Sequence, residues 1–243
     1  MSKYRIIPIF PSPVYESDLD EDILLNALPN LRKKIDENTL DKTMEYYNKN
    51  YYDRYILENK DYKGSEEQFI SEHTEFVEFK ERYILEYPEF SELKKHLQDH
   101  IDFYTKNVIG EKNNRFRLYI TMSWCTGLLP GVSHPEHNHV NSIISGVFFF
   151  DNPENASPFT ITKMNDSTLI YLNPSHPSKY TSNVEYFEPK NGKLLLFPSY
   201  LKHKVPPNET NVKRQSVAFD TFVEGEIGSC RNILKLSKVP QKG

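Results

Sequence analysis

"HPEHNHVNSIISGVFFF", residues 134–150, changes within a short span from a histidine-rich polar stretch to a mostly apolar one. Two arrangements are compatible with it: a metal site at the rim of a β-barrel, or a polar loop that is rich in imidazole. The apolar part is short, β-branched and aromatic, which is typical of a strand buried on both faces. The stretch therefore predicts that a core strand begins where the polar residues end.

The chain after residue 114 shows the residue pattern of β-strands. Six short segments are rich in β-branched and aromatic residues and are bounded by Gly, Pro, Asn or Asp. They are "RFRLYITMSW" at 115–124, "SIISGVFFF" at 142–150, "PFTITKM" at 158–164, "STLIYLN" at 167–173, "KLLLFPSYL" at 193–201 and "RQSVAFDTFV" at 214–223. No helical pattern separates these segments, so we expect a sandwich or a jelly-roll barrel.

The chain before that point, about residues 17–110, has the period of an α-helix. Apolar residues at spacings of three and four form one stripe within 18–38 and a cleaner one within 90–108. The two stripes consist of Ile23, Leu24, Ala27, Leu28, Leu31 and Ile35, and of Phe90, Leu93, Leu97, Ile101, Tyr104 and Val108. Ser91 is a candidate N-cap for the second helix, and "SEEQ" at 65–68 fits a capping box.

The tyrosine-rich segment 44–62 lacks a clear period. We interpret it as a loop with a few packed rings, and the alternative is a lid that contacts a substrate through residues such as Tyr51 and Tyr52. Because helices come first and strands follow, the sequence predicts an α+β fold in one domain over 1–243. That domain would have a helical region at 1–112, a jelly-roll core at 113–230 and a C-terminal tail at 231–243.

Composition limits the partners and the compartment of the protein. A net charge of −4 and a pI near 6.1 disfavour nucleic acid as a partner, because binding phosphates requires a clustered basic surface. Cys125 and Cys230 are the two cysteines and make no disulfide framework or zinc-binding pair, which favours a reducing compartment. The apolar run near the N-terminus is broken by prolines and is too short for a membrane span. We expect a soluble cytoplasmic protein.

Histidines of the second half have the spacing of a metal site. His137 and His139 are two residues apart, and side chains at this spacing on a strand share one face, with Cα atoms about 6.6 Å apart. Two such imidazoles can bind one ion at about 2.1 Å. His203 ends a strongly apolar strand and is the best candidate for a third ligand. Arg214 and Ser216 follow closely on a common strand face, where they could bind a carboxylate beside the metal.

A second ligand set remains open within the same stretch. His134 and Glu136 form an HxE pair, which with His203 would give two histidines and one carboxylate. Pro135 stiffens that pair, so His137 and His139 are favoured. The remaining histidines are expected in solvent or, for the last of them, at the surface or the rim of the site: His73, His96, His100 and His176.

In combination, these motifs resemble one branch of the iron(II)- and 2-oxoglutarate-dependent oxygenases, which carries "SW…PHxHP…SGVYY…G-LLLFPS-L-H-V…R-S-SF". The matching stretches are "SWCTG" at 123–127, "EHNHVNSIISGVFFF" at 136–150, "NGKLLLFPSYLKHKVPPN" at 191–208 and "RQSVAFD" at 214–220. The N-terminal "IFPSPVY" at 9–15, followed by a helix, is also similar, so the resemblance extends over almost the whole chain.

The resemblance implies a double-stranded β-helix, a jelly-roll or cupin-like barrel, with the helical region packed on it. It implies a hydroxylase that uses Fe(II), O2 and 2-oxoglutarate and releases succinate and CO2. His137, His139 and His203 would be the catalytic iron ligands, and Arg214 with Ser216 would anchor the distal carboxylate of 2-oxoglutarate. The motifs leave the substrate open between a small molecule and a protein side chain.

The chain departs from this family at several positions. The wider superfamily has a carboxylate where this chain has His139, so the ion is expected to keep more net charge. Phe148 and Phe149 replace tyrosines and cannot donate hydrogen bonds. Ser145 and Asn141 either line the pocket or serve packing and a turn. Two other functions are alternatives: a three-histidine cupin-type metalloenzyme that does not use 2-oxoglutarate, and a non-catalytic jelly-roll binding module.

Overall fold

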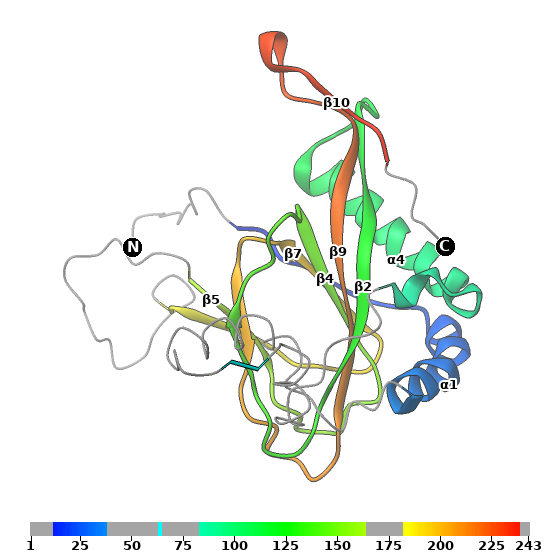
Figure 1. The fold of residues 1–243 in the computed structure, drawn as a ribbon, viewed down its shortest axis with the longest axis vertical. Coiled ribbons are helices and arrows are strands. Elements are labelled where there is room, and N and C mark those ends of the chain that lie inside the picture. Colours follow the sequence, from blue (N-terminus) through cyan, green and yellow to red (C-terminus); the bar gives the residue numbers. More distant parts are fainter. Residues whose placement is uncertain (1–11, 38–62, 65–82, 164–181, 239–243) are drawn as a thin grey trace, which may run out of the picture.

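A computed structural model describes residues 12–37, 63–64, 83–163 and 182–238 (Figure 1). The strands are β1 (Tyr15–Asp18), β2 (Phe116–Leu128), β3 (His134–His137), β4 (Ile144–Phe149), β5 (Phe159–Thr162), β6 (Val184–Phe187), β7 (Lys193–Pro198), β8 (Lys202–Val205), β9 (Arg214–Ile227) and β10 (Leu234–Leu236). The helices are α1 (Glu21–Glu37) and α4 (Ser91–Tyr104), with short helical turns η2 (Ile84–Glu86), η3 (Pro88–Phe90), η4 (Thr105–Ile109) and η5 (Cys230–Asn232).

Several features predicted from the sequence lie outside the described residues. They are the tyrosine-rich segment 44–62, the capping box at 65–68, the strand at 167–173, His73 and His176. In the part of the chain that is described, no helix combines the length and the apolar character needed to cross a lipid bilayer.

The two helices form where the apolar stripes predict them, with two corrections at their ends. Leu97 and Ile101 of α4 are fully buried. Ser91 is the first helical residue and not the N-cap, because the turn η3 runs directly into α4 and leaves Phe90 at the cap position without a side-chain cap. Val108 is 38% exposed, since the helix widens into the π-helical turn η4 and rotates this residue off the stripe.

His100 of α4 also corrects a prediction. It is partly buried and not solvated: its Nδ1 lies 2.8 Å from Tyr15 Oη, and its ring contacts that of His96 with centroids 5.0 Å apart. The hydrogen bond links α4 to strand β1. His100 therefore belongs to the packing of helix on sheet.

The strands form two antiparallel sheets. One is six-stranded with the order β1-β7-β4-β9-β10, and β2 also pairs with β9; the other is four-stranded with the order β3-β8-β5-β6. The expected β half after residue 114 is confirmed, since the predicted segments within the described residues all contain strands. The short strands β1, β3, β6, β8 and β10 were not predicted, because so few residues show no period of their own. His203, expected at the end of the apolar strand, lies instead on β8 in the other sheet.

The six-stranded sheet is buried on both faces. On one face α1 and α4 cover the sheet (Figure 1). We call the apolar cluster between the helices and the sheet the helix-facing core. On the other face lies a second cluster, the inter-sheet core, which consists of Leu128, Val147, Phe149, Phe159, Ile161, Leu195, Phe197, Leu201 and Val205. Burial on both faces explains why β4 and β7 read as continuous apolar runs instead of alternating ones.

Alternate residues of one strand serve the two sides. In β4, Phe148 packs in the helix-facing core and Phe149 in the inter-sheet core. Gly146 lies opposite Phe219 of β9, and a Cβ at this glycine would lie 2.0 Å from the Phe219 ring. Only glycine therefore fits at this point of the strand, which gives the "SG" of the motif a packing reason.

Candidate metal centre

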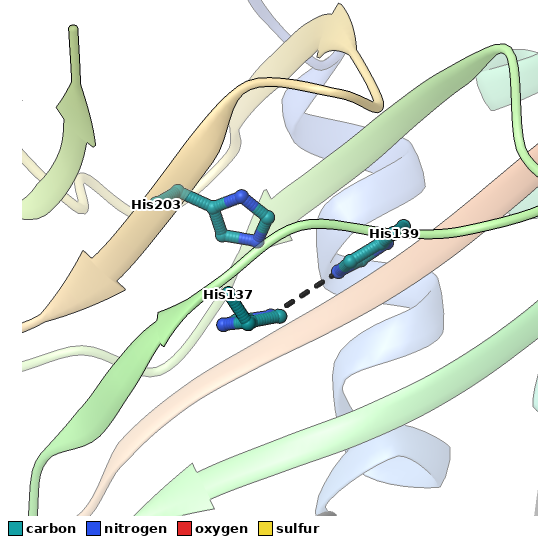
Figure 2. A group of neighbouring side chains, drawn as sticks. All are labelled: His137, His139 and His203. Carbon is teal, nitrogen blue, oxygen red and sulfur yellow. Dashed lines mark hydrogen bonds between the residues drawn. The ribbon is translucent and has the colours of Figure 1, made fainter. Parts of the chain in front are cut away.

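Three histidines meet at the edge of the four-stranded sheet. His137 ends β3 and lies directly opposite His203 of β8 in the strand ladder. His139 follows in the loop after β3, and its backbone N–H donates to the carbonyl of Ser199 at 3.0 Å. Figure 2 shows the three rings facing one another, and one ligand nitrogen of each lies within 4.8 Å of the others. Ladder register and loop together bring side chains from distant parts of the sequence to one point.

The spacing of these nitrogens suits a single metal ion. His139 Nε2 lies 3.2 Å from His137 Nε2. Two nitrogens that bind one ion at about 2.1 Å, with about 90–110° between the bonds, lie about 3.0–3.4 Å apart. The ring centroid of His203 is 4.2 Å from that of His137 and 5.0 Å from that of His139. The cluster thus has the geometry of three ligands on one side of an ion.

The opposite edge of each ring determines its tautomer. The Nδ1 of His137 lies 3.0 Å from the carbonyl oxygen of Pro135, and the Nδ1 of His203 lies 3.0 Å from that of Leu201. The Nδ1 of His139 lies 2.6 Å from Asp220 Oδ1. Carbonyl and carboxylate oxygens only accept hydrogen bonds, so each Nδ1 carries the proton. The lone pairs are left on the Nε2 atoms, as metal ligation requires.

Burial keeps the imidazoles of His137 and His203 neutral. It lowers the pKa of His137 to about 4 and holds the pKa of His203 well below its ordinary value. Neighbouring rings lower the pKa of His203 further, because two positive charges would repel at this distance. A metal ion therefore has no proton to displace from the Nε2 atoms of these two residues near neutral pH.

Arg214 and Ser216 lie in the same cavity as the three histidines. Arg214 is 2% exposed, and its Nε donates to the carbonyl of Ser157 at 3.1 Å. Its guanidinium carbon lies 5.2 Å from the centre of the Phe149 ring. Burial lowers the pKa of Arg214 to about 10, which leaves it charged at pH 7.

One donor of this arginine lacks a partner. Arg214 Nη2 is buried and has no hydrogen-bond acceptor among the described residues. An unsatisfied buried donor on a charged group is costly, and a carboxylate is the acceptor that matches a guanidinium. The donor set of the cavity thus fits an ion at the histidines and an anionic group at Arg214.

The rest of the cavity wall is mostly apolar. It is formed by Trp124, Thr126, Leu128, Gly146, Val147, Phe159, Phe197, Lys204, Val205 and Ala218, with His134 at the histidine end. Apolar walls exclude water from the polar groups and strengthen their electrostatic interactions.

The alternative ligand pair from the sequence is not assembled. The ring of His134 lies 4.4 Å from that of His137, but His134 is outside the group whose nitrogens converge. Glu136 is exposed and is not among the converging ligands, and the register of β3 shifts between His134 and His137. The structure therefore brings together the HxH pair with His203 and leaves the HxE pair apart.

Two further candidates have other roles than lining the cavity. Asn141 is exposed and has a φ of 57°, so it serves the turn between β3 and β4. Ser145 is fully buried and lies behind the histidines, where its Oγ donates to Asp220 Oδ1 at 2.7 Å. Of the two roles expected for these residues, the structure shows the turn for Asn141 and packing for Ser145.

Asp220 is the site residue that sequence reasoning missed. It contacts His139 and lies on β9, four and six residues after Ser216 and Arg214. Because strand side chains at even spacing share a face, the alternation that linked Arg214 with Ser216 extends to Asp220. The even spacing from Arg214 and Ser216 was the sequence signal that could have identified Asp220.

The central part of the chain is similar to a known protein family. Residues 122–220 match a family model described as "Putative 2OG-Fe(II) oxygenase". None of the curated proteins compared with the chain matches it. The matched span contains all three histidines, Arg214 and Ser216.

Several solved structures are also similar to the chain. A prolyl-4-hydroxylase from Pseudomonas putida is 12% identical with a TM-score of 0.46, and the match covers 86% of each chain. AviO1 from Streptomyces viridochromogenes Tue57 is 11% identical with a TM-score of 0.48, over 86% of this chain and 89% of AviO1. An oxidoreductase of the 2OG-Fe(II) oxygenase family from Burkholderia pseudomallei is 13% identical with a TM-score of 0.42. That match covers 56% of each chain, so this chain spans just over half of the Burkholderia protein.

Proposed function

We propose, from the match of residues 122–220 to the 2OG-Fe(II) oxygenase family model, that the protein is an iron(II)- and 2-oxoglutarate-dependent dioxygenase. It hydroxylates a substrate and releases succinate and CO2. His137, His139 and His203 bind the iron, and Arg214 with Ser216 binds the distal carboxylate of 2-oxoglutarate.

One juxtaposition carries this proposal. Three imidazole nitrogens converge in the same cavity that holds the unpaired Nη2 of a buried arginine. A metal site alone has no use for a buried guanidinium, and a carboxylate site alone has no use for three converging lone pairs. A dicarboxylate that also ligates a metal uses both.

Each residue of the site has a distinct role in this proposed function. The three histidines would hold the ion through their converging ring nitrogens. Arg214 forks onto two oxygens of the distal carboxylate, and Ser216 is placed to donate a further hydrogen bond. The apolar wall around Trp124 excludes water. When bound, iron and 2-oxoglutarate supply the oxidation of a substrate C–H bond by O2.

The proposal includes the architecture and the setting of the enzyme. The two antiparallel sheets are the halves of a double-stranded β-helix, with residues 113–230 as its core and residues 1–112 packed on it. The substrate is a small molecule or a protein side chain. The cytoplasm and the absence of a nucleic-acid partner remain predictions from cysteine content and charge.

A three-histidine metalloenzyme that does not use 2-oxoglutarate is the second candidate, because the histidines would serve it equally. The buried Arg214 argues against it, since nothing in such a site pairs with Nη2. A binding module without catalysis is supported by no observation at the cavity.

An anaerobic titration of the Fe(II)-loaded protein with 2-oxoglutarate tests the proposal. We expect a visible charge-transfer band that saturates at one equivalent, because the ligand must chelate the iron to produce it. Binding of iron without such a band would favour the second candidate. Failure to bind iron would refute both metalloenzymes, and succinate formation under air would complete the support.

A further inference from the structure

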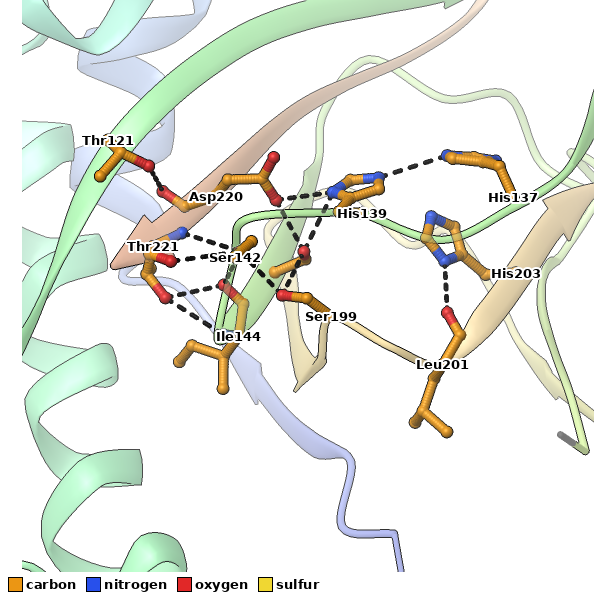
Figure 3. Close-up of polar contacts among 11 residues, drawn as sticks. Thr121, His137, His139, Ser142, Ile144, Ser199, Leu201, His203, Asp220 and Thr221 are labelled. Carbon is orange, nitrogen blue, oxygen red and sulfur yellow. Dashed lines mark hydrogen bonds and ion pairs between the residues drawn. The ribbon is translucent and has the colours of Figure 1, made fainter. Parts of the chain in front are cut away.

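The carboxylate of Asp220 lies directly behind the metal centre. Its Oδ1 is 2.6 Å from His139 Nδ1, and the side chains of the two residues are 5% and 6% exposed. Ser145, the cross-strand partner of Asp220, donates to the same oxygen at 2.7 Å. Ser199 lies 2.9 Å from Ser145 and extends the network. Figure 3 shows Asp220 beside His139, with Ser199 nearby. The carboxylate is thus held at a fixed distance from His139.

Asp220 is buried in this position without a basic partner. Among the described residues, no lysine or arginine forms an ion pair with it, and His139 is its one ionic contact. A carboxylate buried in this way is costly unless a positive charge compensates it. Across the imidazole ring from Asp220, the Nε2 of His139 faces the place where the three ligand nitrogens converge. A cation at that place would compensate the carboxylate through the ring.

We propose that Asp220 is a positioning residue, which supplies from behind His139 the single negative charge that a ligand carboxylate supplies in sites with two histidines and one carboxylate. The proposal rests on the proposed iron site. It replaces the expectation that a third histidine leaves the ion with more net charge, because the same charge is present one ring further out. Asp220 also fixes the tautomer of His139 and makes its Nε2 a stronger donor to the ion.

This role makes Asp220 necessary only while residue 139 is a histidine. Placing a carboxylate at position 139 would restore the charge at the ion itself. Asp220 would then face a second carboxylate, and the two like charges would repel. The effect of neutralising Asp220 therefore depends on the residue at position 139, and in that way it differs from a residue that only supports the fold.

Four proteins test the dependence: the wild type, Asp220→Asn, His139→Asp and the double variant. Their affinity for Fe(II) is measured without oxygen, by competition with a chelator. We expect Asp220→Asn to weaken binding about 10- to 100-fold in the wild type, as loss of such a partner does. In the His139→Asp background the same change should leave the affinity unchanged or raise it. The midpoint potential of the bound iron should rise in Asp220→Asn, because Fe(III) loses more stabilisation than Fe(II).

Glu226→Gln is the matched control, since it makes the same carboxylate-to-amide change on β9 at a residue paired with Lys235. It should leave iron affinity and potential unchanged. Equal losses in both backgrounds, or no loss in either, would overturn the role of Asp220. If Asp220→Asn does not fold, Ser145→Ala should give a smaller loss of iron affinity that also disappears in the His139→Asp background.

The outcome separates this inference from the proposed function. A wild type that binds Fe(II) and gives the 2-oxoglutarate band, with Asp220 variants of equal affinity, would overturn only the role of Asp220. A wild type that does not bind Fe(II) would overturn both.

Discussion

The two faces of the six-stranded sheet are both buried, yet they differ in chemistry. The helix-facing side is built of apolar residues such as Leu97, Val217 and Phe219. The opposite side carries a buried arginine, a buried carboxylate and, from the facing sheet, a cluster of histidines. Strand β9 contributes to both sides through alternate residues. The comparison teaches that one strand can stabilise the fold with one face and hold the chemistry with the other.

The polar side of the sheet contains a buried group that lacks a hydrogen-bond partner among the described residues. Arg214 Nη2 is buried without an acceptor in the described part of the chain, and the imidazole nitrogens converge on one another. Buried polar groups in folded proteins almost always have partners, so exceptions mark functional sites. The helix-facing core offsets the cost of these groups. Substitutions on the two faces should therefore separate function from stability.

The largest separation is expected at His203. His203→Ala should abolish Fe(II) binding, since the ring lies opposite His137 and two nitrogens alone hold the ion weakly. Thermal unfolding of the metal-free protein should change little or shift upward, because a buried ligand cluster is relieved. His100→Ala is the control on the helix-facing side and should keep full iron binding. Stoichiometric iron in His203→Ala, measured by elemental analysis, would contradict the ligand role.

Arg214 should affect the co-substrate alone. Arg214→Ala should weaken 2-oxoglutarate binding at least about 30-fold, or about 2 kcal/mol, as loss of one partner of a buried charge pair does. Iron affinity should stay within a few-fold. Arg117→Ala removes an exposed arginine, paired with Asp102, and is the matched control. An anaerobic 2-oxoglutarate titration that gives the same affinity for both variants would refute the carboxylate anchor.

The helix-facing core should behave in the opposite way. Leu97→Ala creates a cavity at a fully buried position of α4 and should lower the free energy of unfolding by about 2–5 kcal/mol. The folded protein should bind Fe(II) as tightly as the wild type, because Leu97 packs in the helix-facing core and the metal centre lies on the other side of the sheet. Denaturant unfolding gives the first quantity and chelator competition the second. A parallel loss of both would show that the two faces are coupled.

A pH dependence should distinguish the faces in the metal-free protein. Burial lowers the pKa of His137 to about 4 and that of His134 to about 3, whereas histidines of the unfolded chain titrate near 6.5. Between pH 6.5 and about 4 the unfolded state therefore binds more protons, so stability falls as the pH falls. The unfolding temperature, followed over this range, should decrease less steeply in His137→Gln. Identical pH profiles for the two proteins would contradict this assignment.

The smallest effect on stability is expected at the surface ion pair between α1 and the loop after β4. Arg32 donates to both carboxylate oxygens of Asp151, but it is half exposed. Exposed ion pairs contribute about 0–1 kcal/mol, so Arg32→Ala should lower the free energy of unfolding by no more than that. Iron binding should not change. A loss above about 2 kcal/mol in denaturant unfolding would indicate a structural role beyond the ion pair.

Local patterns alone were enough to predict much of this protein. The apolar periods located α1, α4 and the long strands, because burial of a stripe or a face imposes a period on the residues themselves. The spacing of His137, His139, Arg214 and Ser216 indicated a metal beside a carboxylate site. These features depend on residues close in sequence, and for that reason they can be seen without a structure.

Only the tertiary structure decided what depends on register between distant segments. It placed His203 opposite His137, left Glu136 outside the cluster and put Asp220 against His139. It also paired the short strands β1, β3 and β10, whose few residues have no period to detect. Which face of a strand meets which neighbour is set by pairing across the sheet, and a shift of one residue would exchange the faces. Sequence spacing named the groups that could react, and long-range pairing determined which of them meet.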